Sequence, residues 1–327
     1  MSTSMIGESL RVVQIGKQTD FDTDVTPTAI LMGVEDVSIK PENKTTVLKQ
    51  LRGSLQPGRN AVMTEKGGSG KVDIQATYED SLYLVESLLG VATPSGGGPY
   101  TRDYAAPSAA AVATPRINTF MVGYAGASTP YQLVGAHTSK LSIKAATGEP
   151  VMMSAELVGY EVKSGTLASL SERAVNQIMG HECAIYVDAW GGTIGSTQIE
   201  NLAYSFELEI DPARALGRRL SLLPSTVDEN MWGGTLKMSM MVAATTETLL
   251  TAIAEAVAAE RRQIRILFTS GTNIFRVDFG GAFVEAPEIY TVSEDMLALE
   301  FSLEASENTS LGNFLKIHSV NSVSAIP

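Results

Sequence analysis

The feature of this sequence that most constrains its fold is a series of segments in which apolar and polar residues alternate, and the series occurs twice. The first alternating segment of each series ends at a proline, Pro41 in the first half and Pro212 in the second. A further alternating segment covers residues 72–78 in the first half and 236–242 in the second. Alternation with a period of two is typical of β-strands that bury one face, so we predict a mainly β fold.

The other elements follow in the same order in both halves. Each half has a polar loop, a strand, a helix signal, a hairpin and a last alternating strand. The corresponding ranges are 41–70 and 212–234 for the loops, 81–90 and 246–261 for the helices, 120–133 and 264–279 for the hairpins, and 151–157 and 297–303 for the last strands. A shared order of element types, with one helix at the same place, indicates an internal duplication.

A chain of 327 residues exceeds the size at which a single core usually stops growing, which favours two domains. We therefore predict two tandem β-sandwich or barrel-like domains, each with one flanking α-helix. The first copy covers residues 10–165, a linker covers 166–182 and the second copy covers 183–318. The segment 91–115 is rich in Gly, Ala, Ser and Pro, and we predict that it is a surface loop inserted in the first copy.

The two predicted helices carry end signals. Asp80 or Ser81 can cap the first helix, and Gly90 can end it. The second helix is predicted from about Thr246 to Arg261, with basic residues at the end where the helix dipole favours positive charge.

The charge balance argues against a surface that grips nucleic acid. The net charge is -12 and the isoelectric point is near 4.8, whereas such binding depends on Lys and Arg that neutralise phosphates. The first residues lack the basic and then apolar order of a signal peptide, and no apolar run is long enough to cross a bilayer. We expect a soluble protein that does not bind membranes.

Cysteine and histidine are too few for a metal or catalytic site. Cys183 is the single cysteine, and we predict that it is a core thiol. His137, His181 and His318 are not spaced as metal ligands and form no constellation with a serine and an acid. We therefore predict a protein that is not an enzyme and has no cofactor.

Acidic residues dominate the polar faces of the predicted strands. The acidic candidates are Asp73, Glu156, Glu207, Glu209, Asp211, Glu300 and Glu304. An ordinary solvated sheet face explains this pattern. A second hypothesis is that several of these strands join sheets of neighbouring subunits and line an acidic channel, because closure into a ring removes open strand edges.

Several short motifs resemble one protein family. The segment 15–23 reads IGKQTDFDT and resembles the N-terminal stretch of siphovirus tail tube proteins, where a Gly-Lys-Gln run leads to a Phe-Gly-Thr turn. Asp22 stands at the glycine of that turn, although Asp adopts a left-handed backbone less readily than Gly. Residues 52–53, 78–80 and 191–195 also resemble this family of long-tailed phage major tail proteins.

The resemblance implies a β-sandwich or barrel unit whose inner sheet contributes to a continuous β-barrel around the lumen of a ring. It implies stacked rings in the virion tail, assembled in the host cytoplasm, and a channel for the tape measure protein and DNA during genome delivery. Tail terminator and distal tail proteins are the other implied partners, and DNA passes without specific binding. With two units per chain, we expect trimeric, pseudo-hexameric rings.

The long loops have an implied role in stacking, because in this family the loop between the second and third strands reaches a neighbouring ring. Here these loops are residues 41–70 and 212–234. The implied inter-ring contacts are Leu48, Leu51, Arg52, Leu55, Arg219 and Leu222.

A protein of another class, a receptor- or glycan-binding β-sandwich of a virion or cell surface, is the alternative. It would need a concave cluster of aromatic residues. Aromatic residues are only 6% of the chain, and Trp190 and Trp232 lie in predicted turns, which favours the structural hypothesis.

Overall fold

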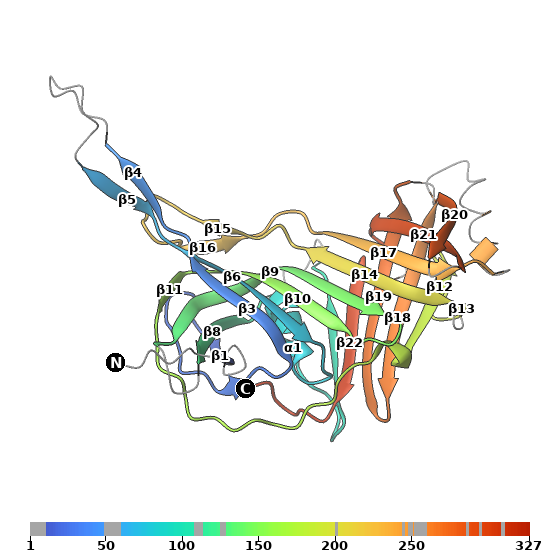
Figure 1. Cartoon of the computed structure of the whole chain (residues 1–327), viewed down its shortest axis with the longest axis horizontal. Coiled ribbons are helices and arrows are strands. Elements are labelled where there is room, and N and C mark those ends of the chain that lie inside the picture. The colour runs from blue at the N-terminus through green and yellow to red at the C-terminus, as the bar shows by residue number, and fades with distance from the viewer. Residues whose placement is uncertain are drawn as a thin grey trace.

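The computed structural model describes residues 11–48, 60–107, 114–124, 129–199, 202–243, 246–247, 251, 260–285, 288–293, 296–308 and 311–327. These residues form a mainly β structure, as the alternating segments predict. All paired strands are antiparallel, and most belong to one large sheet that passes through both halves of the chain. In Figure 1 the first half lies on the left in blue to green, and the second half lies on the right in yellow to red.

The elements of the first half are β1 (Arg11–Gln18), β2 (Ala29–Ile30), β3 (Val34–Pro41), β4 (Lys44–Val47), β5 (Ala61–Glu65), β6 (Gly68–Gln75), α1 (Ser81–Leu89), β7 (Tyr100–Ala105), β8 (Ile117–Tyr124), β9 (Tyr131–Ala146), β10 (Met152–Gly159) and β11 (Glu161–Ser164). Those of the second half are the short 3₁₀ helix η2 (Gly180–Glu182), β12 (Cys183–Ala189), β13 (Gln198–Ile199), β14 (Ala203–Asp211), β15 (Ala215–Gly217), β16 (Thr226–Asp228), β17 (Gly233–Met241), β18 (Arg261–Ser270), β19 (Asn273–Phe283), β20 (Glu288–Ser293), β21 (Met296–Ala305) and β22 (Leu315–Asn321).

One layer of the molecule is a sheet that continues from the first half into the second. Its strands follow the order β3, β6, β10, β9, β14, β17 and β21, and β20 pairs with β21. We call these strands the inner sheet. The junction of the halves is the pairing of β9 with β14, in which Ile143 lies opposite Leu208. The two halves are therefore joined by backbone hydrogen bonds rather than by the linker alone.

The second layer differs between the halves in one strand. In the first half β2, β1, β8, β9 and β11 pair in that order, and in the second half β13, β12, β18, β19 and β22 do so. The strand β7 of the first half then pairs with β22. The pairing order is otherwise the same in both halves, including the hairpins β4–β5 and β15–β16.

The apolar faces of both layers form the core. Val72, Ile74, Leu208 and Ile210 from the inner sheet are buried with Phe268 from the second layer, as the alternation predicts. Cys183 packs against this core but is only partly buried, so the prediction of a core thiol holds in part. Burial raises the pKa of its thiol to about 12, which makes it a poor nucleophile.

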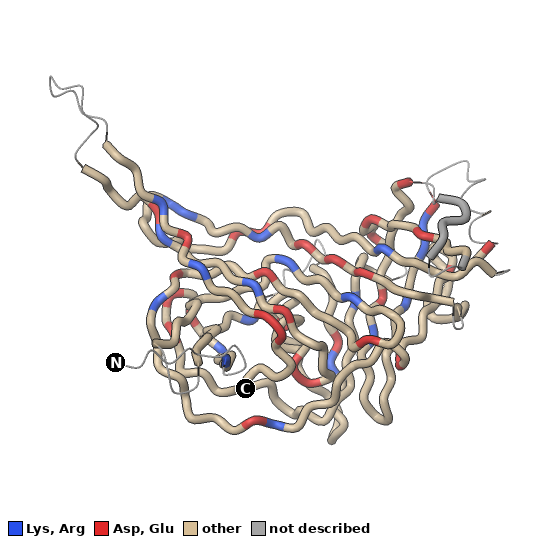
Figure 2. The backbone as a smooth tube through the Cα atoms, in the orientation of Figure 1, with Lys and Arg blue, Asp and Glu red and all other residues tan. Residues whose placement is uncertain are grey.

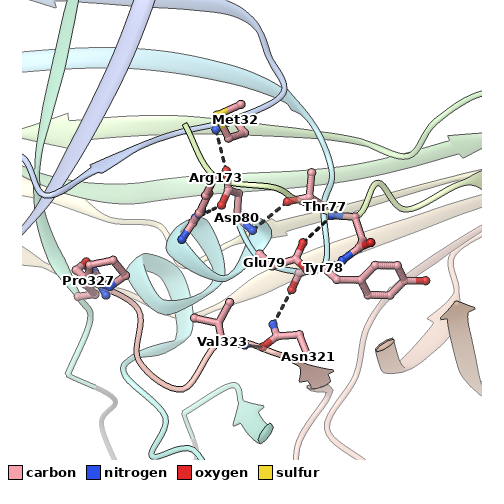
Figure 3. Close-up of polar contacts among 11 residues, drawn as sticks. Met32, Thr77, Tyr78, Glu79, Asp80, Arg173, Asn321, Val323 and Pro327 are labelled. Atoms are coloured by element: carbon pink, nitrogen blue, oxygen red, sulfur yellow. Dashed lines mark hydrogen bonds and ion pairs between the residues drawn. The ribbon is translucent and has the colours of Figure 1, made fainter. Parts of the chain in front are cut away.

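The first predicted helix is confirmed as α1, which is buried along its whole length and is followed by Gly90 with a φ of 99°. Asp80 stands at the N-cap, but its side chain does not cap the helix. Its carboxylate instead accepts hydrogen bonds from the backbone N–H of Met32 and from the Arg173 guanidinium (Figure 3). Asp80 thus attaches the linker to the first half.

The second predicted helix is wrong at its end. Thr246, Glu247 and Thr251 are helical, and most of the remaining residues of that prediction lie outside the described part of the chain. Arg261 and Arg262, expected at the helix end, begin β18 because their backbones pair with β19.

The prediction of a surface loop at 91–115 is also wrong for residues 100–105, because these residues form the strand β7. Arg102 and Tyr104 of β7 are buried although the surrounding sequence is small and polar. The Arg102 guanidinium donates to the Val323 carbonyl at 2.7 Å, beyond the end of β22. A segment that could not form a core alone is therefore folded by a strand from the other half.

The segment predicted as a linker, residues 166–182, contacts the first half through Arg173 and Asn176. The carboxylate of Glu79 accepts hydrogen bonds from the backbone and the side-chain amide of Asn176 at 2.9 and 2.8 Å. The Asn321 amide, from the second half, donates to the Tyr78 carbonyl at 2.6 Å. Residues 78–80 therefore hold both the linker and the end of the second half, close to the Asp80 contacts in Figure 3.

We predict that His137, on the strand β9 that joins the halves, makes stability depend on pH. Burial lowers its pKa to about 4, from 6.5, and its ring nitrogen lies 2.9 Å from the Gly135 carbonyl. Between pH 6.5 and pH 4 the unfolded state binds more protons at this histidine than the folded state does. The free energy of unfolding is therefore unaffected by His137 above pH 6.5 and falls as the pH drops toward 4. The loss is on the order of 3 kcal/mol. Urea unfolding of His137→Gln should show a shallower pH dependence over this interval, and an unchanged slope would contradict the prediction.

Candidate functional site

The inner sheet carries charged side chains on the face opposite the core, and we call this surface the polar face. Its charged residues are Asp36, Lys40, Lys71, Asp73, Lys140, Lys144, Glu156, Glu207, Glu209, Asp211, Lys237, Glu300 and Glu304. All the acidic residues predicted from the sequence lie on strands of this one sheet. Figure 2 shows red and blue positions along its strands.

At two positions of the polar face the strand register places an acidic residue between two lysines, whereas Asp36 lies opposite Asp73. Glu156 lies between Lys71 of β6 and Lys140 of β9. Glu207 lies between Lys144 of β9 and Lys237 of β17. Cross-strand pairs of opposite charge stabilise a sheet, whereas like charges directly opposite destabilise it.

Two ion pairs link the two halves across the polar face. Lys140 Nζ lies 2.9 Å from Glu209 and Lys144 Nζ lies 2.8 Å from Glu207, so both pairs connect the first half to the second. The hydrogen bond to Glu209 raises the pKa of Lys140. These side chains are partly exposed, and each such pair contributes about 1 kcal/mol or less.

The sequence prediction missed Lys140 and Lys144, which lie on the same face as the predicted acidic residues. They alternate with Ser142 on β9, so the period-two pattern could have shown that they share a face. Carboxylates outnumber lysines on the described polar face, but its charge is mixed rather than uniformly acidic. Two adjoining depressions on this face are each lined by both carboxylates and lysines.

The first long loop contains a hairpin rather than an irregular loop. Strands β4 and β5 pair and extend away from the rest of the molecule (Figure 1), and we call this hairpin the arm. Every residue of β4 is exposed, and so are Leu48 and Val62. Three of the predicted contacts, Leu51, Arg52 and Leu55, lie outside the described residues.

The second long loop also contains a hairpin, β15–β16, but it lies against the first half (Figure 1). Arg219 and Leu222 of this loop are exposed, and their predicted contact with another subunit stays a prediction. The backbone carbonyl of Leu222 accepts a hydrogen bond from Lys66 at 2.7 Å, so part of the loop is fixed within the chain.

Arg214, at the start of this loop, is buried and was not predicted. Its guanidinium donates to the carbonyls of Ser87 and Leu88 at the end of α1 and to that of Thr138 in β9, each at 2.7 Å. Burial lowers the pKa of the Arg214 guanidinium, while its ion pair with Glu229 at 2.7 Å compensates the charge. The preceding Ala213 has a φ of 49°, which turns the backbone into the first half.

No group of three or more His, Cys, Asp or Glu side chains that could hold a metal ion occurs among the described residues. Within that same part of the chain, no helix is long and apolar enough to cross a membrane.

The chain was also compared with models of known protein families. A family model described as phage tail tube protein matches residues 9–305. The chain belongs to the phage tail tube protein family. The predicted resemblance is confirmed, and this bacteriophage protein is a structural subunit of a tail tube in the virion. No curated protein matches the chain.

Proposed function

We propose that three copies of this tail tube subunit form a ring of six domains, and that rings stack into a tube. The two halves of each chain act as copies of one unit at residues 10–165 and 183–318. The shared pairing order of the halves supports this division, since β3, β6 and β10 correspond to β14, β17 and β21.

The observation that carries the proposal is the pair of strand edges at the ends of the inner sheet. Among the described residues, β3 pairs only with β6, and β20 pairs only with β21. By their places in the two halves, β3 corresponds to β14 and β20 corresponds to the end of β9. Since β9 pairs with β14 within the chain, β20 of one copy can pair with β3 of the next. Ser142 lies opposite Glu209, so the equivalent pair between copies is Glu288 and Ser38.

The polar face then lines the channel. Its excess of carboxylates repels phosphate, while its lysines hold the carboxylates in place, so DNA passes without being bound. The tape measure protein occupies the same channel before DNA does. The tube meets a tail terminator and distal tail proteins at its ends and is assembled in the host cytoplasm. The subunit catalyses no reaction and needs no cofactor.

The long loops connect successive rings. The proposed contacts are Leu48, Leu51, Arg52, Leu55, Arg219 and Leu222. Support comes from the exposure of Leu48 and Leu222, two apolar side chains that a monomer would leave in water. Many small contacts repeated around and along the tube give it rigidity.

The proposal is tested by imaging and cross-linking the purified full chain. Negative-stain microscopy should show rings or filaments. In a Cys183→Ser background, Ser38→Cys combined with Glu288→Cys should form disulfides between copies on oxidation, and closed trimers should be the largest product of a single ring. Monomers that form neither rings nor cross-links would contradict the proposal.

A further inference from the structure

The β15–β16 loop packs against the first half of its own chain, and this contact suggests how an equivalent loop could pack between two copies. Arg214 fixes the start of the loop on α1 and β9. Further along, the guanidinium of Arg218 donates to the Lys66 carbonyl and lies 3.5 Å from Glu65. A second-half loop therefore covers the surface of the half that precedes it across the β9–β14 junction.

Gly67 shows how closely this loop packs. A Cβ atom at Gly67 would lie 2.9 Å from the Arg218 guanidinium and 3.2 Å from the Leu216 side chain. A larger residue at this position would therefore displace the loop. Thr138, beneath Arg214, is fully buried.

Among the described residues, the corresponding surface of the second half carries exposed apolar side chains. Lys40 of β3 and Asp211 of β14 are equivalent, because each directly precedes a proline. Ser69 pairs with Lys40 and Gly233 pairs with Asp211, so Ser69 and Gly233 are equivalent too. Two residues earlier, Met231 takes the place of Gly67 and is 91% exposed.

A second exposed position lies near the end of β19. Val284 follows Thr138 by the offset of 146 residues that relates the two halves in this region, and it is 54% exposed whereas Thr138 is fully buried. The second half thus exposes apolar side chains where the first half is covered by a loop. Exposed apolar side chains at a shared location indicate a contact surface.

The arm is the counterpart of the β15–β16 loop. It follows β3 as that loop follows β14, and it leaves the first half on the side away from the second (Figure 1). By the offset of 171 residues between β3 and β14, Val47 takes the place of Arg218. Val47 is 54% exposed, and Val62 and Met63 on the paired strand are exposed too.

We propose that the base of the arm docks laterally on the second half of the neighbouring copy in the same ring, with Val47 over Met231. This contact between two copies is equivalent to the contact of Arg218 with Gly67 within one copy. In place of a guanidinium against a glycine, it brings two apolar side chains together. It rests on the proposed ring, because the pairing of β3 with β20 brings the arm to that surface.

In this placement, different parts of the arm contact different neighbouring copies. The base, β4 and β5, lies on a neighbour within the ring, so only residues beyond the base serve contacts between rings. Removal of Val47, Val62 and Met231 from water is the driving force, and its apolar character makes the contact tolerant of salt, unlike an ion pair between exposed groups.

The test uses two single-cysteine variants of the full chain, Val47→Cys and Met231→Cys, both in a Cys183→Ser background. They are mixed in equal amounts, assembled and treated with a short bismaleimide. Since each chain holds one cysteine, every cross-link joins two copies. We expect the mixture to give at least a fivefold excess of dimers over either variant alone. The matched control replaces Met231→Cys by Tyr131→Cys, which is also exposed but lies on β9, and should give no excess.

The disulfide between Ser38→Cys and Glu288→Cys tests the ring, whereas the bismaleimide cross-link tests the docking of the arm, so the two proposals can fail separately. If that disulfide forms but the mixture gives no excess of dimers, lateral docking of the arm is wrong and the ring stands. If neither forms, both fail. Dimers that appear only in stacked filaments and not in isolated rings would show that the arm binds the adjacent ring, which also overturns lateral docking.

Discussion

Arg214→Ala is expected to destabilise the subunit by about 3–5 kcal/mol, the usual range when one partner of a buried ion pair is removed. The substitution leaves the Glu229 carboxylate without its partner and three backbone carbonyls, those of Ser87, Leu88 and Thr138, without their donor. Buried groups that lose a hydrogen bond keep the cost of desolvation and gain nothing in return. Urea unfolding followed by Trp232 fluorescence measures the change, because Arg214 lies over that ring.

The matched control for this substitution is Arg218→Ala. Arg218 belongs to the same loop and also contacts the first half, but its side chain is 22% exposed and its ion pair with Glu65 is 3.5 Å long. We expect it to cost about 1 kcal/mol or less. Equal unfolding midpoints for the two variants would contradict the role of Arg214 in fixing the loop on α1.

Replacement of Glu207, Glu209 and Asp211 by Lys should convert a channel that DNA passes into one that holds DNA. Each chain gains six units of positive charge, and Lys144 and Lys140 lose their partners Glu207 and Glu209. Assembled tubes of the triple variant should retain duplex DNA at low salt and release it as salt rises, because binding depends on neutralised phosphates. Phage that carry the variant should show reduced DNA delivery.

A control with the same change in charge places lysine at Asp20, Asp22 and Glu307, which are exposed and lie outside the inner sheet. This variant should leave DNA passage unchanged. Intact tubes of the first variant with normal DNA delivery and no retention of DNA would show that the polar face does not line the channel.

The strand pattern was predictable because it depends on local sequence. A strand that buries one face must alternate, so the segments around Val72, Leu208 and Leu236 indicated their own buried faces. The helix at 81–89 was predictable for the same reason, since its length and its terminal Gly90 are local signals. The polar face followed from the same alternation, and its predicted acidic residues do lie on one sheet.

Other features depend on partners that are distant in sequence. Arg102 and Tyr104 lie in a segment whose composition is that of a loop, and they form a strand only because β22 offers an unpaired edge. Lys140 and Lys144 compensate the acidic residues because β9 lies beside β14 and not beside another strand, a choice that no local pattern determines.

By itself, the sequence determined the class of fold, the order of its elements and the family, because periodicity and short motifs are written along the chain. Only the tertiary structure decided which edges stay open, which surface each loop covers and which charges become partners. Arg214 makes the difference plain. In a polar loop an arginine is expected in water, and its burial is possible only where carbonyls from residues 87, 88 and 138 converge on one point.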